Sequence, residues 1–261
     1  MKITQSKDGT TLAYDVYGNG PALIFITGAT CFRSFEPVLY DAQIFAEQFT
    51  VYNYDRRGRG DSGNTLPYAI ERELEDIEAM IDAAGGKAYL YGHSSGAILA
   101  LEATLKLGEK VNKLVMYDPS YANNEVDQNE FNELSQRLYI LLDSGKNDEA
   151  ISLFLEGIGI PKEVVSGMQQ SPQWATMAAL APTLVYDITL ASDLPPIERA
   201  CRLTTPALII VGEDSPASLH EVASQLREAI PDAQYSQLTG QDHMANPEVL
   251  LPVLSGFLLN Q

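Results

Sequence analysis

Basic residues, cysteines and long apolar runs are all scarce in this 261-residue sequence. Its 17 Lys and Arg residues stand against 35 Asp and Glu residues, which gives a formal net charge of −18. Such a surface repels phosphate backbones and anionic lipids, so we expect no nucleic-acid partner and no membrane partner. No apolar run approaches the about 20 residues that a membrane-spanning helix needs. The N-terminal stretch MKITQSKDGTTLAYDV also lacks the apolar core of a signal peptide.

Cysteine occurs only at Cys31 and Cys201, which are far apart and not in a metal-binding spacing. This scarcity argues against a disulfide framework and fits a reducing compartment. We therefore expect a cytoplasmic protein.

Apolar runs alternate with stretches of helical periodicity in both the first and the last part of the chain. Helices are predicted over residues 68–83, 96–107, 217–229 and 247–259. Strands are predicted over residues 2–5, 11–16, 22–27, 50–54, 88–91, 111–117, 207–211 and 233–238. The first two strands flank a Lys-Asp-Gly turn and predict a hairpin. The later alternation predicts an α/β protein with a parallel sheet and helices on both faces.

This alternation stops between residues 120 and 200. The segment shows several helical stretches and no clear strand. We interpret it as a helical cap or lid over residues 120–200, inserted into a core domain of residues 1–119 and 201–261.

Residues 92–96 read GHSSG and lie between a predicted strand and a predicted helix. This context fits the G-x-S-x-G nucleophile elbow, in which a strained turn presents one hydroxyl. Ser94 is the central residue and therefore the candidate nucleophile. The amide of Ser95 would point at the same reacting atom from the positive end of the helix. The competing interpretation is a glycine-rich turn whose serine only caps the helix.

A serine hydroxyl needs a base, and the chain has three histidines. His93 lies inside the elbow and cannot easily turn onto its neighbour. His220 lies in a predicted helix, whereas His243 lies in a loop after the last predicted strand. Because sites form at the carboxyl ends of parallel strands, His243 is the candidate base.

The oxyanion formed during acyl transfer needs a second amide donor. Gly28 and Ala29 follow the first buried strand, and small residues there let a substrate oxygen approach. The amide of Ala29 is our candidate for this second donor.

The segment YDRRGRGDSG at residues 54–63 contains a G-x-G-x-x-G pattern. Its context does not fit dinucleotide binding, because no helix follows directly and no ribose-binding carboxylate follows the next strand. We interpret it as a structural turn in which Arg56, Arg57 and Asp61 hold loops together.

The segments ITGAT, YDRRGRGDSG, GHSSG and GQDH occur in an order that resembles the α/β-hydrolase superfamily across nearly the whole chain. The chain looks most like a bacterial subgroup with a GHSSG elbow and an acid after strand six. The resemblance implies an eight-stranded, mostly parallel sheet with a helical cap between strands six and seven. It also implies hydrolysis through an acyl-enzyme.

The acid of the triad is open between two aspartates. The family's usual position after strand seven is occupied here by Ser215. Asp214 lies one residue earlier, where Ser215-Pro216 looks like a helix N-cap with proline in the first turn. Asp118 follows strand six, beside the elbow strand, and some similar relatives carry their acid there. We prefer Asp118 and keep Asp214 as the alternative.

Together these residues predict a serine hydrolase that cleaves a carboxylic ester, lactone or thioester of a small molecule. We expect it to work without metal or cofactor and to be a monomer or homodimer. The rivals are a non-catalytic binding protein on the same fold and perhydrolase or haloperoxidase-like use of the same triad. Tyr121 and Trp174 are candidates for lining the substrate pocket, although each could instead belong to the core of the cap.

Overall fold

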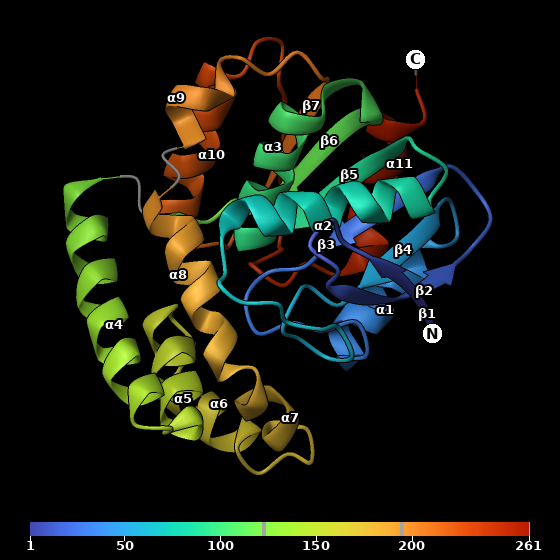
Figure 1. Ribbon diagram of the computed structural model, residues 1–261. Helices are drawn as coiled ribbons and strands as arrows, with labels where there is room; N and C mark the ends of the chain where they lie inside the picture. The colour runs from blue at the N-terminus through green and yellow to red at the C-terminus, as the bar shows by residue number, and fades with distance from the viewer. Residues whose placement is uncertain (122–123, 194–195, 261) are drawn as a thin grey trace.

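The structure is a computed structural model that describes residues 1–121, 124–193 and 196–260. Eight strands form one sheet in the order β1-β2-β4-β3-β5-β6-β7-β8 (Figure 1). β1 and β2 form the predicted hairpin, and β2 pairs antiparallel with β4. All other neighbours pair in parallel. The strands are β1 (Lys2–Gln5), β2 (Thr11–Tyr17), β3 (Ala22–Ile26), β4 (Thr50–Tyr54), β5 (Ala88–His93), β6 (Val111–Tyr117), β7 (Ala207–Gly212) and β8 (Gln234–Leu238).

Helices cover both faces of this sheet, as predicted for parallel strands. β3 shows why its sequence is a continuous apolar run. Leu23 and Phe25 pack on one face with α1 and α11, whereas Ile24 and Ile26 pack on the other face with α2, α3 and α10. These helices are α1 (Glu36–Phe45), α2 (Ile70–Ala83), α3 (Ser95–Leu107), α10 (Ala217–Ala229) and α11 (Pro247–Leu258).

The sequence patterns did not predict α1. Its N-cap residue is Phe35, which makes no side-chain capping bond. Its buried face consists of Val38, Ala42 and Phe45. A helix without a polar cap and with so narrow an apolar face gives little sequence signal.

The described part of the segment between β6 and β7 contains helices and no strand. These helices are α4 (Glu125–Asp143), α5 (Asn147–Gly157), α6 (Lys162–Met168), α7 (Trp174–Ala179), α8 (Leu184–Asp193) and α9 (Pro196–Ala200). Figure 1 shows α4 to α7 to one side of the sheet, with α8 leading back towards α3. Residues 122–123 and 194–195 of the predicted cap lie outside the described residues. No helix in the described part of the chain is long and apolar enough to cross a membrane.

Candidate active site

The turn between β5 and α3 carries Ser94 in a strained backbone conformation, with φ 57° and ψ −127°. Two glycines make this turn possible. A β-carbon on Gly92 would lie 2.4 Å from the carbonyl oxygen of Gly96, and one on Gly96 would lie 2.3 Å from that of Ile26. Both atoms belong to the backbone and cannot move aside, so only glycine fits. The predicted strand, turn and helix are therefore present at the elbow.

The loop after β3 lies directly against the elbow. A β-carbon on Gly28 would lie 3.0 Å from Ser94 Cβ and 3.5 Å from Ser94 Oγ. Ala29 follows in this loop, and Ser95 is the first residue of α3. The first N–H groups of a helix have no intrahelical acceptor. Ser95 thus adjoins Ser94 in the chain, and Ala29 follows a glycine that lies against Ser94 in space.

His243 and Asp118 meet beside this turn. The Nδ1 atom of His243 lies 3.0 Å from Oδ2 of Asp118, which is the contact expected from the sequence. Asp118 is fully buried and has a positive φ of 45°. Its Oδ1 accepts the N–H of Gly212 at 3.1 Å, and its Oδ2 accepts the hydroxyl of Ser215 at 2.6 Å. These two bonds fix the direction of the carboxylate towards His243.

The alternative acid is differently placed. Asp214 is exposed, and its N–H donates to the carbonyl of Gln241. The N-cap expected at Ser215 is also wrong, because Pro216 is the N-cap of α10. The hydroxyl of Ser215 instead donates to Asp118, since the turn after β7 directs it inward. Ser215 therefore helps to hold Asp118, which follows the neighbouring strand β6, in its contact with His243.

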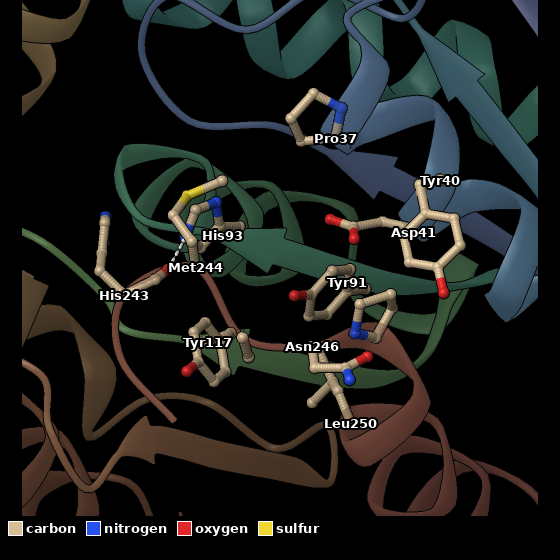
Figure 2. Close-up of a pocket in the computed structure, with 12 residues that line it drawn as sticks. Pro37, Tyr40, Asp41, Tyr91, His93, Tyr117, His243, Met244, Asn246 and Leu250 are labelled. Carbon is tan, nitrogen blue, oxygen red and sulfur yellow. Dashed lines mark hydrogen bonds between the residues drawn. The ribbon is translucent and has the colours of Figure 1, made fainter. Parts of the chain in front are cut away.

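His93 holds the loop that carries His243, a contact that the sequence patterns did not predict. Its ring lies 4.7 Å from that of His243, and its Nε2–H donates to the backbone carbonyl of His243 at 2.8 Å (Figure 2). Tyr117 also donates its hydroxyl to the carbonyl of Asp242 in the same loop. The histidine after the elbow glycine was a visible signal, but its partner lies 150 residues away.

A pocket of about 470 Å³ opens beside His93, between the loop that carries His243 and helices α1 and α11. Figure 2 shows His93 on one side of it and Asp41 and Tyr91 on the other. Burial raises the pKa of Asp41 to about 7. Burial and the neighbouring His243 lower the pKa of His93 to about 4. His93 is therefore neutral near pH 7 and keeps one ring hydrogen on Nε2 for the loop.

The two residues proposed to line the substrate pocket lie in different places. Trp174 is buried in the apolar core of the cap, and its indole N–H donates to Asp148 at 2.6 Å. Tyr121 is half-buried and packs against the apolar core on the α3 side of the sheet. Ala29 and Phe35 border the core of the cap, so the cap approaches the loop that follows β3.

The chain is similar to known hydrolases over most of its length. It is 29% identical over 259 residues to 2-(acetamidomethylene)succinate hydrolase of Mesorhizobium japonicum, with 92% of this chain and 89% of that protein covered. It superposes with a TM-score of 0.88 on an alpha/beta hydrolase from Sphaerobacter thermophilus, at 39% identity over 98% of this chain and 99% of that one. An esterase from Thermogutta terrifontis shares the fold, with a TM-score of 0.76 and 20% identity over 99% and 97% of the two chains. The profile described as "Alpha/beta hydrolase family" matches residues 23–252. The chain therefore belongs to the α/β hydrolase family, and it is a hydrolase by this kinship.

Proposed function

We propose that this hydrolase cleaves a carboxylic ester, or a lactone or thioester, of a small molecule through an acyl-enzyme on Ser94. The observation that carries the proposal is the 3.0 Å contact between His243 Nδ1 and the buried carboxylate of Asp118, next to a strained serine elbow. A nucleophile, a base and a group that orients the base are the parts that acyl transfer requires.

In this mechanism Asp118 accepts the Nδ1–H of His243, so the lone pair of Nε2 is free to act as base. Nε2 takes the proton of Ser94 while Oγ attacks the acyl carbon, and the N–H groups of Ala29 and Ser95 stabilise the oxyanion. The protonated His243 then gives its proton to the leaving alcohol. A water molecule that loses its proton to Nε2 then attacks the acyl carbon. The bond from this carbon to Ser94 Oγ breaks as Nε2 returns the proton to Oγ, and the acid is released.

The relatives support a hydrolase but do not select the bond. The Mesorhizobium japonicum protein is named for a substrate that contains an acetamido group. Ester cleavage is therefore tested against amide cleavage with matched substrates. We further propose that residues 120–200 form a lid over the site and that the substrate is a small molecule. We also propose that the protein is cytoplasmic and is a monomer or homodimer. These proposals depend on the composition and the patterns of the sequence.

The test combines covalent labelling with a substrate panel. We expect a fluorophosphonate probe to label the wild-type protein at Ser94, and Ser94→Ala to lose both labelling and ester hydrolysis while melting at the wild-type temperature. Ser144→Ala, at an exposed position after α4, is the matched control and should behave as wild type. p-Nitrophenyl esters of increasing chain length, with the matching anilides, define the acyl group and the bond.

Each outcome separates the candidates. A wild-type protein that neither reacts with the probe nor turns over any ester would favour the binding-protein rival. Unchanged turnover in Ser94→Ala would assign the nucleophile to another residue. Bromination or peracid formation that exceeds hydrolysis would favour the perhydrolase rival.

A further inference from the structure

A buried carboxylate reaches from the cap into the elbow. Asp187 of α8 is 5% exposed. Its Oδ1 accepts the hydroxyl of Ser95 at 2.8 Å and Nη1 of Arg56 at 2.9 Å, and its Oδ2 accepts Nη2 of Arg59 at 2.6 Å. These three donors all come from the core of the hydrolase, so Asp187 joins one helix of the cap to the residues around Ser94.

The first of these bonds acts on one oxyanion donor. Ser95 carries the proposed donor N–H at the start of α3, and its side chain is buried. With its hydroxyl held by Asp187, Ser95 and the start of α3 that carries its N–H are held in place against α8. The direction of its N–H is thereby fixed before a substrate arrives, which is the condition for electrostatic preorganisation.

The bond between Asp187 and Arg59 acts on the other donor, the N–H of Ala29, through the peptide group of Gly28. Arg59, held by Asp187, donates its Nη1–H to the carbonyl oxygen of Gly28 at 2.6 Å. That carbonyl and the N–H of Ala29 belong to the same peptide plane and point in opposite directions across a trans bond. Since Gly28 lies against Ser94, a carbonyl held on the arginine side turns the N–H of Ala29 away from Arg59.

The charges of this cluster balance. Arg56 also makes two bonds of 2.7 Å with Glu73, so two guanidinium groups face two carboxylates in a buried space. Burial by itself would raise the pKa of Asp187, but Arg59 and Arg56 outweigh it and hold that pKa below its ordinary value. Asp187 is therefore charged at neutral pH and binds both arginines as an anion.

We propose that Asp187 is a positioning residue for the oxyanion hole, which holds the amides of Ser95 and Ala29 in place from the cap. The inference rests on the proposed function, because it assigns a purpose to the same two amides. As a consequence, the packing of α8 against the core affects kcat and leaves the affinity for substrate largely unchanged.

The experiment compares Asp187→Asn with Asp76→Asn. Asp76 is a matched control, because it is 1% exposed and bonds Arg57 at 2.8 and 2.7 Å in the same arginine segment without touching the elbow. We expect Asp187→Asn to lower kcat about 10- to 100-fold, below the full loss of one donor, with KM within threefold. Its affinity for a trifluoromethyl ketone that mimics the oxyanion should fall in parallel. Asp76→Asn should lose thermal stability and keep both kcat and ketone affinity.

A second variant keeps the test decisive if Asp187→Asn does not fold. Arg59→Lys retains the positive charge, but one ammonium group lacks the fork that bonds Gly28 and Asp187 together. The same parallel loss of kcat and ketone affinity is expected in this variant. Wild-type values in the folded variants, or an equal loss in Asp76→Asn, would overturn the inference. Failure of the proposed function would appear earlier, as a wild-type protein without esterase activity or labelling.

Discussion

Asp118→Asn is the substitution that most sharply tests the proposed pairing of Asp118 with His243. Asp118 accepts three hydrogen bonds, from Gly212 to Oδ1 and from Ser215 and His243 to Oδ2. Asparagine supplies one oxygen and one NH2 group in the same volume. If its oxygen keeps the N–H of Gly212, its NH2 group faces Nδ1 of His243.

Two donors cannot face each other, so Nδ1 must give up its hydrogen and the proton must move to Nε2. A histidine protonated on Nε2 cannot accept the proton of Ser94. The expected loss in kcat is about 10⁴-fold, which corresponds to about 5.5 kcal/mol of transition-state stabilisation. The flipped amide would leave the buried N–H of Gly212 without an acceptor, so the arrangement that keeps this hydrogen bond is favoured.

The assay is kcat for a p-nitrophenyl ester, with thermal melting as the check on folding. Asp214→Asn is the control, because Asp214 is exposed and bonds Gln241 only through its backbone N–H. It should keep kcat within about threefold, as surface substitutions usually do. If Asp214→Asn were inactive and folded while Asp118→Asn kept its activity, the assignment of the acid would be refuted.

Three further predictions concern the elbow, the histidine loop and the cap. Gly96→Ala should lower the free energy of unfolding by about 3 kcal/mol or more, measured by urea titration, because its β-carbon would lie 2.3 Å from the carbonyl oxygen of Ile26. His93 should cost the wild-type protein stability as pH falls from its unfolded pKa of 6.5 to its folded pKa of about 4, since only the unfolded state binds the proton in that window. The difference between wild type and His93→Gln, whose amide still reaches the carbonyl of His243, should therefore shrink by roughly 3 kcal/mol over this window, and a flat difference would contradict the burial argument. Trp174→Phe should lower the melting temperature but keep KM within about twofold, because the indole lies in the core of the cap; a large rise in KM would return this residue to the substrate pocket.

Local sequence patterns predicted the elements that carry Ser94 and lead to His243. The elbow could be recognised because its glycines, serine and flanking apolar runs are neighbours in the chain. The structure extends β5 to His93, two residues beyond the predicted end, so that the strand leads directly into the turn. α1 was missed because its few buried residues and its uncapped start leave no strong periodicity.

The sequence by itself determined the α/β alternation and the serine turn, and it made His243 the candidate base, because these depend on neighbouring residues and on the edge where parallel strands end. The tertiary structure decided which aspartate meets the imidazole, since Asp118 and His243 are 125 residues apart and only sheet order brings them together. It likewise decided that Asp187 reaches Ser95 across 92 residues. A buried carboxylate must find donors wherever the folded chain supplies them, and no local pattern encodes that position.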